Sequence, residues 1–317
     1  MKEISTPKNI DWLKKEIKRI KEEKNALIMA HYYQREEIQD IADFIGDSLA
    51  LARQAAKTDA DIIVMCGVHF MGETAKILCP DKKVLIPDLK AGCSLADSCD
   101  PVEFKEFVES HPDHTVISYV NTSAAVKALT DIVVTSGNAR QIVEKLPEEE
   151  KIIFGPDHNL GEYINSVTGR KMLLWKGACH VHDRFSIEKI IEMKKEHPGA
   201  KILVHPECRR PLQLIADKVG STAALLDFAQ KDEAQEYIVV TESGILFEMR
   251  NKCPHKTFLA APAEDSECQC NECDFMKLNT LQKVYDCLVK ESPEIIVDEE
   301  MAEKAVRPIQ RMLDMSN

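Results

Sequence analysis

A repeat inside the chain constrains the fold more than any other feature of the sequence. Residues 30–51 (AHYYQREEIQDIADFIGDSLAL) and residues 204–225 (VHPECRRPLQLIADKVGSTAAL) align without a gap and are identical at nine of 22 positions. About one or two identities would arise by chance in such a comparison. Two copies of one segment, this far apart in the chain, indicate that the protein is built from repeated units.

Short apolar segments alternate with helix-length segments over most of the chain. Nine of these segments are candidate strands: ALIMA, DIIVMC, KVLIP, TVISYV, DIVVTS, KIIFGP, KILVHP, YIVVTE and TFLAAP. Strands rich in Ile and Val that are separated by helices predict parallel sheets with helices on both faces. In such proteins the ligands bind beyond the carboxyl ends of the strands.

A middle copy, ISYVNTSAAVKAL, completes the repeat. Its Tyr119 aligns with the histidine near the start of each other copy, and after a 13-residue deletion its Ser123 aligns with Ser48 and Thr222. Each copy is expected to continue with a strand (DIIVMC, DIVVTS, YIVVTE), a helix and a third strand that ends at a proline. We therefore predict an α/β protein made of three homologous three-layer α/β/α sandwich units, with parallel sheets, around a pseudo-threefold axis.

The predicted units divide the chain into four parts. The first unit covers 25–100 and is preceded by an amphipathic helix within 8–24. The second unit covers 101–183 and the third covers 184–273. The remaining segment, 274–317, has helical periodicity and is expected to pack back on the sandwiches.

Charge and hydropathy exclude several classes of protein. The 317 residues include 41 Lys and Arg against 53 Asp and Glu, a net charge of −12, without a basic patch interleaved with aromatic residues. This pattern argues against nucleic acid as a partner. The charged N-terminus and the lack of an apolar run of about 18 residues argue against a signal peptide and a membrane span. We therefore expect a cytoplasmic protein that acts on small molecules.

Polar residues recur after the first strand of each predicted unit. They are His31 and Tyr33, Tyr119 and Asn121, and His205 and Glu207. Such groups transfer protons or form hydrogen bonds, and they are costly to bury without partners. The predicted helix starts at 46–48, 121–123 and 220–222 offer free N–H groups to an anion, and Ser136 offers a further hydroxyl. One such residue is more often structural, but recurrence in three copies favours a shared site.

Eleven cysteines are many for a chain kept in a reducing compartment, where cysteines more often bind metal than form disulfides. Cys93, Cys179 and the segment ECQCNEC, which contains Cys273, each follow the third predicted strand of a unit. Three thiolates around an axis can hold three irons of a [4Fe–4S] cluster and leave the fourth iron open as a Lewis acid. Five other cysteines are interpreted as small buried hydrophobic residues: Cys66, Cys79, Cys208, Cys253 and Cys287.

The cysteine spacing alone does not separate iron–sulfur from zinc. Cys270 and Cys273, together with His180 or His182, have the composition of a tetrahedral zinc site.

The motifs taken together resemble those of the quinolinate synthase family, from about Leu27 to Leu313. They are AHYYQ, GDS, CGVHFMGETAKIL, PDLKAGCSLADS, YVNTSAAVKA, TSGNA, GPDHNLG, WKGACHVHDRF, HPECRRP, GSTAAL, and CxxM followed by TL. The resemblance implies one oxygen-sensitive [4Fe–4S] cluster per chain, held by one cysteine from each unit. It also implies that iminoaspartate, supplied by an aspartate-oxidising enzyme, condenses with dihydroxyacetone phosphate. The products would be quinolinate, for de novo NAD biosynthesis, phosphate and two waters.

Carried over by position, the resemblance implies a set of site residues. The cluster ligands would be Cys93, Cys179 and Cys273. The residues that contact iminoaspartate would be His31, Ser48, Tyr119, Asn121, Ser136, His205, Glu207 and Thr222. Proton transfer would involve Tyr33 and Glu207, with Glu207 as the base and His205 as a proton carrier or hydrogen-bond donor.

The last cysteine motif departs from the CxxCxxC of some family members. Its first spacing is shortened to Cys268-x-Cys270, while Cys270-x-x-Cys273 is kept. Cys270 therefore competes with Cys273 as the third ligand, and a regulatory disulfide in this segment is left open. Two other functions also stay open. One is an iron–sulfur hydro-lyase of another pathway that acts on a di- or tricarboxylate, and the other is a zinc-binding protein without turnover.

Overall fold

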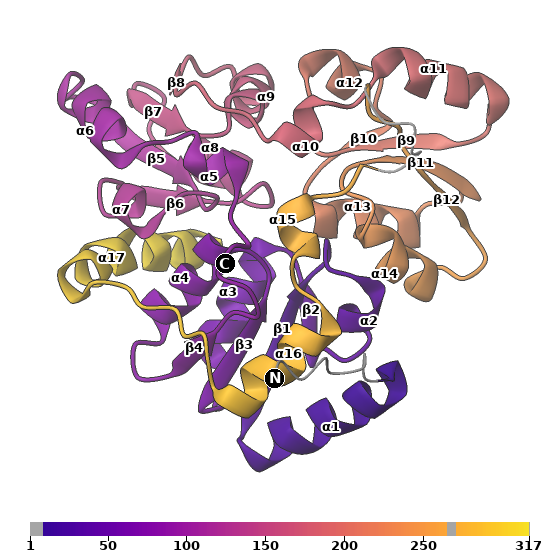
Figure 1. Cartoon of the computed structure of the whole chain (residues 1–317). Helices are drawn as coiled ribbons and strands as arrows, with labels where there is room; N and C mark the ends of the chain where they lie inside the picture. The colour runs from indigo at the N-terminus through magenta and orange to yellow at the C-terminus, as the bar shows by residue number, and fades with distance from the viewer. Residues whose placement is uncertain (1–8, 265–270, 317) are drawn as a thin grey trace.

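The Ile- and Val-rich segments form the strands of three separate parallel sheets in the computed structural model, which describes residues 9–264 and 271–316. Each sheet forms the centre of one lobe of the molecule (Figure 1). We call these lobes the first, second and third units, with the proposed ranges 25–100, 101–183 and 184–273. The predicted fold class, three α/β/α units with parallel sheets, is confirmed.

All three sheets have the same strand order: second, first, third, fourth. The first unit contains β1 (Ala26–His31), β2 (Phe44–Gly46), β3 (Ile62–Cys66) and β4 (Lys83–Leu85). The second contains β5 (Thr115–Tyr119), β6 (Ile132–Val134), β7 (Ile152–Gly155) and β8 (Leu173–Leu174). The third contains β9 (Lys201–Val204), β10 (Lys218–Val219), β11 (Glu236–Val240) and β12 (Thr257–Ala260).

The helices repeat in the same way. The helices that precede the first strand of each unit are α1 (Ile10–Glu23), α6 (Pro101–Glu109) and α11 (Ile187–Glu196). Those after the first strand are α2 (Glu36–Gln39), α7 (Ala124–Lys127) and α12 (Arg210–Leu214). Those after the second are α3 (Ser48–Lys57), α8 (Ala139–Lys145) and α13 (Thr222–Lys231). Those after the third are α4 (His69–Leu78), α9 (His158–Thr168) and α14 (Ile245–Lys252). A single-turn helix follows the fourth strand: α5 (Ser94–Asp97), α10 (His180–Asp183) and α15 (Asp274–Lys277).

The strands of the first unit are continuous apolar segments because helices cover both faces of its sheet. Alternate residues of β3 face opposite sides, and both sides are covered by helices. Ile63 packs in the cluster that contains Leu51 of α3 and Ala75 of α4. Val64 packs in the cluster on the other face, which contains Ile17 of α1.

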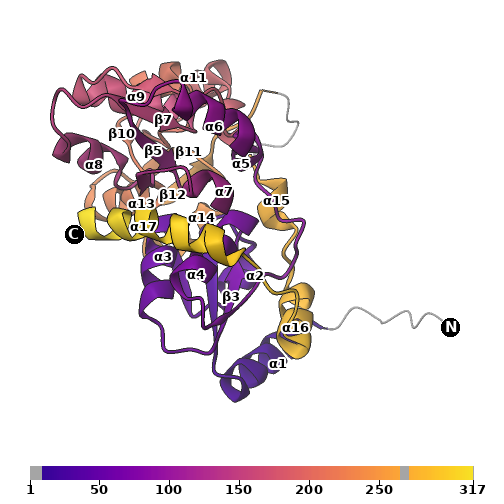
Figure 2. The ribbon, with the colours of Figure 1, turned by 90° about the vertical axis from the view of Figure 1, so that its left-hand side faces the viewer.

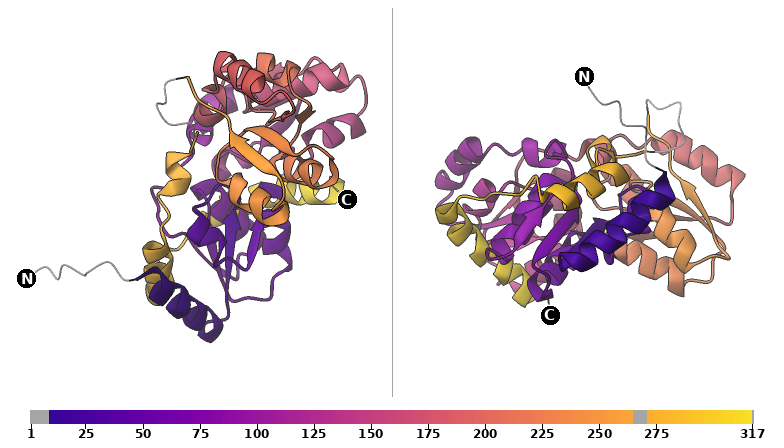
Figure 3. Two further views of the ribbon diagram at one scale, coloured as in Figure 1. Left: turned by 90° about the vertical axis from the view of Figure 1, so that its right-hand side faces the viewer. Right: turned by 60° about the horizontal axis from the view of Figure 1, so that its bottom comes forward.

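The C-terminal helices cover surfaces that the units leave open. Helix α16 (Leu281–Lys290) lies beside α1 under the first unit (Figure 3). Helix α17 (Glu299–Met315) runs between the first and second units, in contact with α4, α7 and β6 (Figure 2). Among the described residues, no helix is both long enough and apolar enough to cross a membrane.

The sequence predicted nine strands, and the structure contains twelve within the described residues. The three additional strands are β2, β8 and β10, which are only two or three residues long. Their short sequences, FIG, LL and KV, contain no apolar run that periodicity could detect.

The predicted alignment of the middle copy is wrong. In each unit the first strand pairs with the second strand fifteen residues further on (31 with 46, 119 with 134, 204 with 219). Strand β6 is therefore the counterpart of β2 and β10, not of β3 and β11, and no deletion is needed. Ser136, rather than Ser123, is the counterpart of Ser48 and Thr222.

One hydrogen bond supports this corrected alignment. Asp43, Asp131 and Asp217 lie at matching positions, and each accepts from the backbone N–H of the residue fifteen positions earlier in the first strand of its unit, at 2.8–2.9 Å. Over this alignment the middle copy shares only Asp131 and Ser136 with residues 30–51. The repeat is therefore threefold and gapless in structure, although the middle copy has diverged in sequence from the first.

Candidate active site

The residues predicted for the site line one cavity between the three units. They are His31, Tyr33, Ser48, Cys93, Tyr119, Asn121, Ser136, Cys179, His205, Glu207, Thr222 and Cys273. The cavity, including its mouth, encloses about 680 Å³ of space that no atom fills. This volume is in the range of small-molecule sites.

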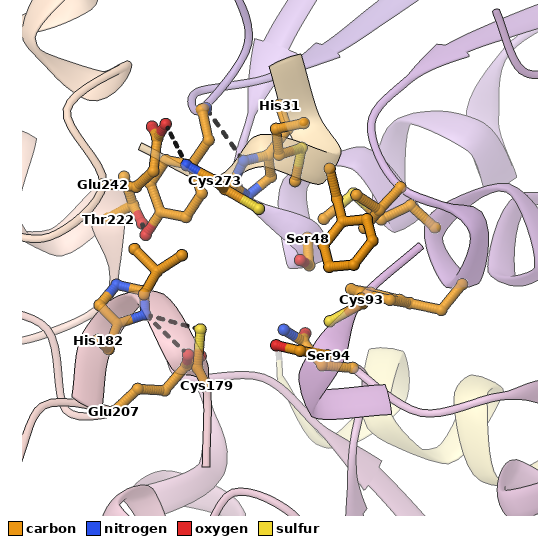
Figure 4. Close-up of a pocket in the computed structure, with 18 of the residues that line it drawn as sticks. His31, Ser48, Cys93, Ser94, Cys179, His182, Glu207, Thr222, Glu242 and Cys273 are labelled. Atoms are coloured by element: carbon orange, nitrogen blue, oxygen red, sulfur yellow. Dashed lines mark hydrogen bonds and ion pairs between the residues drawn. The ribbon is translucent and has the colours of Figure 1, made fainter. Parts of the chain in front are cut away.

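The three candidate ligand cysteines occupy equivalent places. Cys93, Cys179 and Cys273 are the N-cap residues of α5, α10 and α15, the single-turn helices that follow the fourth strand of each unit. Figure 4 shows their sulfur atoms facing the same open space from three sides. The repeat thus brings one thiol per unit to the cavity.

The three thiols have raised pKa values, so they would ionise only when they bind a metal. Burial raises the pKa of Cys93 to about 12 and that of Cys273 to about 11, and it raises the pKa of Cys179 as well. A buried thiol of this kind loses its proton readily only when a cation replaces it. Three thiols from three directions fit a cluster with three protein ligands better than a mononuclear site with four.

Of the residues named for the zinc alternative, His180, His182 and Cys273 line the same cavity. Cys268 and Cys270 lie outside the described residues. His182 lies beside Cys179, with its Nδ1 3.3 Å from that sulfur, and beside Glu207. Cys179, His182 and Glu207 offer ligand atoms within 4.8 Å of one another and could also hold a metal ion. The five cysteines predicted to be small hydrophobic residues are buried, as is Cys99.

His31 and His205 are neutral hydrogen-bonding groups at equivalent positions. Burial lowers the pKa of each to about 3. The Nδ1 atom of His31 accepts from the backbone N–H of Tyr33 at 3.1 Å, and that of His205 accepts from the backbone N–H of Glu207 at 3.4 Å. Because a neutral imidazole carries one proton, this places the proton of each ring on Nε2. His205 Nε2 lies 3.2 Å from Ser136 Oγ, so it can donate there.

Glu207 is a buried acid of the cavity with close contacts to both carboxylate oxygens. Its Oε1 accepts from Tyr119 Oη at 2.5 Å, and its Oε2 lies 3.0 Å from Nδ1 of His182. Burial alone raises the pKa of Glu207, but the contacts with the neighbouring imidazoles and the hydrogen bonds from His182 and Tyr119 outweigh burial and lower it to about 2. Glu207 is therefore a carboxylate near neutral pH.

A chain of hydrogen bonds joins Tyr33 to Glu207. Tyr33 Oη lies 2.7 Å from Thr241 Oγ1, which lies 2.9 Å from Nε2 of His182. The other nitrogen of His182 faces Glu207. Tyr33 Oη is also 2.9 Å from Thr222 Oγ1. Burial raises the pKa of Tyr33 well above its usual value, so this hydroxyl keeps its proton and can pass it on only as an acid.

Three hydroxyls lie at matching helix starts. Ser48 and Thr222 are the first residues of α3 and α13, and Ser136 lies just before α8. All three line the cavity, whereas Ser123 caps α7 and does not. N–H groups and hydroxyls at these starts can hold the negatively charged groups of a substrate.

Two site residues were not predicted as such. His182 was considered only as a zinc ligand, and Glu242 was not considered. Glu242 lines the cavity and accepts from the backbone N–H of Cys273 at 3.1 Å, and Asp157, at the matching position of the second unit, accepts from the N–H of Cys179 at 3.0 Å. An acid two residues after the third strand of a sheet was the signal available in the sequence.

The chain is similar to known proteins over most of its length. The family model described as NadA, quinolinate synthetase A protein, matches residues 15–314. The chain is 54% identical over 301 residues to the quinolinate synthase of Chloroherpeton thalassium, covering 95% of this chain and 94% of that protein. It is 56% identical over 300 residues to the quinolinate synthase of Microcystis aeruginosa, with 95% and 94% covered. The quinolinate synthase of a Synechocystis strain is 55% identical over 300 residues, with the same coverage.

Proposed function

This chain belongs to the quinolinate synthase family, the enzymes that make quinolinate for de novo NAD biosynthesis, and from this premise we propose its substrates, its cofactor and the roles of its site residues. The substrates are iminoaspartate and dihydroxyacetone phosphate, and the products are quinolinate, phosphate and two waters. The observation that carries the proposal is the convergence of three equivalent cysteines and an acid–base set on one cavity.

The cofactor is a [4Fe–4S] cluster held by Cys93, Cys179 and Cys273. When bound, a cluster with three protein ligands supplies an open iron that polarises a substrate hydroxyl or carboxylate. Glu242 and Asp157 support this assignment because their carboxylates fix the backbone of two of the three cysteines.

The hydroxyls and the neutral histidines bind and orient the substrates. Ser48, Ser136 and Thr222 hold the carboxylates of iminoaspartate, with N–H donors from the helix starts. His31 and His205 donate from Nε2, since their Nδ1 atoms are already acceptors. Tyr119 and Asn121 complete the set from the second unit.

Glu207 removes protons during the two dehydrations, and Tyr33 returns them. Dehydration needs a base for the carbon-bound proton and an acid for the leaving oxygen. The hydrogen-bond chain through Thr241 and His182 supports this pairing because it links the two groups across the cavity. Apolar side chains such as Phe70, Met71 and Val68 line part of the cavity and exclude bulk water.

Anaerobic purification followed by a quinolinate assay tests the proposal. We expect a brown protein with a broad absorbance band at about 400 nm, and we expect this band to disappear on exposure to air. The protein should also form quinolinate from the two substrates. A colourless protein with one zinc per chain would overturn the cofactor. A brown protein that dehydrates a di- or tricarboxylate but makes no quinolinate would overturn the substrates.

Two sets of variants test the residues. C93S, C179S and C273S should each lose the cluster absorbance, whereas C270S should keep it; the reverse result for C270S and C273S would move the third ligand. E207Q should keep the cluster absorbance and lose turnover by about 100-fold or more, as expected for a missing general base. Retained activity in E207Q would remove Glu207 from the mechanism.

A further inference from the structure

The same loop in each unit contributes to the cavity lining at one equivalent position. This loop follows the first strand of the sheet, and it presents Tyr33 in the first unit, Asn121 in the second and Glu207 in the third. The pairing of the first and second strands makes these three positions equivalent. Strand pairing ends before them, so other contacts must fix their backbone.

A long side chain from the following helix or its end holds each loop. Gln39 Nε2 donates to Tyr32 O at 3.0 Å and to Gln34 O at 2.9 Å. These two carbonyls stand on either side of Tyr33. The matching residue of the third unit, Gln213, donates to the carbonyls on either side of Glu207, those of Pro206 at 2.9 Å and Cys208 at 2.7 Å.

In the second unit a lysine takes the place of glutamine. Lys127 Nζ donates to Val120 O at 2.8 Å and to Thr122 O, the carbonyls on either side of Asn121. In all three units the donor therefore lies seven and five residues after its two acceptors. The shared feature is an N–H donor at the end of a long side chain, because both glutamine and lysine supply one.

Each of these side chains also reaches the neighbouring unit. Gln39 Nε2 donates to Gly244 O of the third unit at 2.9 Å, and Gln213 Nε2 is 3.5 Å from Asn159 O of the second unit. Lys127 Nζ lies 5.4 Å from the centre of the Phe70 ring of the first unit. The strand registers place Phe70, Asn159 and Gly244 at one equivalent position, four residues after Cys66, Gly155 and Val240. The contacts thus run from first to third, third to second and second to first unit.

We propose that Gln39, Lys127 and Gln213 are positioning residues that hold Tyr33, Asn121 and Glu207 in the cavity and fix each loop against the neighbouring unit. Within the described residues, Gln39 Oε1 is buried without a hydrogen-bond partner, which indicates that this amide is kept for its N–H groups. Catalytic groups need support of this kind, because a displacement of about 1 Å can cost about 100-fold in rate. The proposal rests on the site roles proposed above.

The chain offers a matched control outside the cavity. Lys256 Nζ donates to Ala229 O at 2.7 Å and to Asp232 O, and it lies 5.4 Å from the centre of the Tyr237 ring. Like Lys127 it contacts two carbonyls and one aromatic ring, and it also donates to the Tyr237 hydroxyl at 3.3 Å. K256M therefore measures the loss of such contacts where no site residue depends on them.

The experiment compares Q213M, Q213K, K127M, K127Q and K256M in the cluster-bearing enzyme purified anaerobically. Because Glu207 has a chemical role and Asn121 a binding role, Q213M should lower kcat about 10- to 100-fold, with KM within about threefold. K127M should instead raise KM about tenfold or more. Q213K and K127Q exchange the two donors that the repeat itself uses, so each should restore most of the loss. K256M should change neither constant by more than about twofold.

Backbone hydrogen exchange tests this proposal independently of the proposed reaction. The amides of His205, Glu207 and Cys208 should exchange about tenfold faster in Q213M than in wild type, and should be unchanged in K256M. Unchanged exchange in Q213M would overturn the proposal. Kinetic constants of Q213M and K127M that equal those of K256M would also overturn it, as would a failure of Q213K and K127Q to restore activity. A wild-type enzyme that makes no quinolinate would overturn the proposed reaction, while the exchange result would still decide whether the loop is held.

Discussion

Tyr119 Oη donates a hydrogen bond of 2.5 Å to Glu207 Oε1, and this bond joins the second and third units across the cavity. The other carboxylate oxygen faces His182 at 3.0 Å. Both contacts stabilise the ionised carboxylate, and they are part of why its pKa falls although Glu207 is buried. A base held in this way is always ionised near neutral pH, and its strength depends on which of its partners move when substrate binds.

Removal of the Tyr119 hydroxyl should make Glu207 easier to protonate. In Y119F the carboxylate loses one donor, and a hydrogen bond to a charged group contributes about 1.5–3 kcal/mol. The acid limb of the pH–rate profile should therefore move up by about one to two pH units, since 1.36 kcal/mol corresponds to one unit. We expect a fall in kcat of about tenfold or more at pH 7, because Tyr119 is also one of the proposed substrate contacts.

Tyr237 provides the control for this variant. Its hydroxyl also donates to a carboxylate, that of Asp232 at 3.0 Å, but outside the cavity. Y237F should leave the acid limb where it is in wild type. An acid limb that does not move in Y119F would show that the bond to Tyr119 does not set the pKa of Glu207.

Gly244 should not tolerate a side chain, because the Tyr33 loop passes directly over it. A Cβ added at Gly244 would lie 2.8 Å from both Cα and C of Tyr33. Backbone atoms cannot yield as the end of a flexible side chain can, so G244A should displace the loop and cost about 1–3 kcal/mol of stability. We expect kcat to fall about tenfold or more with the loss of Tyr33 geometry.

The measurement is chemical denaturation together with steady-state kinetics. Gly199→Ala is the matched control, since its added Cβ would meet no atom within 4 Å. Activity and stability of G244A equal to those of G199A would contradict the close contact between Gly244 and Tyr33.

The sequence was sufficient for the long, buried strands and for the outer two copies of the repeat. Strand β3 is apolar on both faces because α1 covers one face and α4 covers the other. A strand of this kind appears in the sequence as a continuous run of apolar residues, which is easy to detect. The short edge strands β2, β8 and β10 were missed because two or three residues carry no periodicity. The middle copy was misaligned because its identity to the first copy is confined to Asp131 and Ser136, and only strand pairing shows that these match.

The candidate site was predictable where a residue type recurs in three copies and less so elsewhere. Cys93, Cys179 and the segment ECQCNEC stand out because each unit supplies cysteine after its last strand, whereas the choice of Cys273 within that segment rests on the family resemblance. His182 and Glu242 act through contacts with residues that are distant in the chain. His182 contacts the carboxylate of Glu207, and Glu242 accepts a hydrogen bond from the backbone N–H of Cys273. Spacing along the chain can mark Glu242 as an acid two residues after a third strand, but it does not show which residue this acid contacts.

The aspartate that recurs in the three units, Asp131 in the second, should stabilise the fold although its side chain is exposed. Asp131 is exposed, yet its Oδ2 accepts from the N–H of Val116 at 2.8 Å, and its own N–H donates to Val116 O at 2.9 Å. D131A leaves the N–H of Val116 without this partner at the beginning of a buried strand. We expect a loss of about 1 kcal/mol in the free energy of unfolding, the usual effect of one hydrogen bond.

Urea denaturation measures this loss, and Asp314→Ala is the control. Asp314 is also exposed and accepts only from the side chain of Gln310 in the same helix. D314A should change the free energy of unfolding by less than about 0.5 kcal/mol. Equal effects of D131A and D314A would mean that the recurring bond does not stabilise the sheet.

Lys127 should make the stability of this enzyme depend on pH above neutrality. Burial lowers the pKa of Lys127 to about 8, and the nearby carboxylate of Glu73 offsets only part of this effect. In the unfolded chain the same amine has a pKa of about 10.4. Between these values the unfolded state binds the proton and the folded state does not, so stability rises with pH in this window. Below about pH 8 the folded protein instead carries the cost of a buried cation.

Lys127→Gln removes the titrating group and keeps an N–H donor for the two carbonyls. Relative to K127Q, wild type should gain up to about 2 kcal/mol in the free energy of unfolding between pH 7.5 and pH 9.5, since each unit contributes at most about 1.36 kcal/mol. Groups elsewhere titrate equally in both proteins, so the difference between the two curves isolates Lys127. Urea denaturation of both proteins at the two pH values provides the measurement. Parallel curves would show that the Lys127 ammonium does not lose its proton in this window, and that the carbonyls of Val120 and Thr122 with the Phe70 ring stabilise the cation enough to offset its burial.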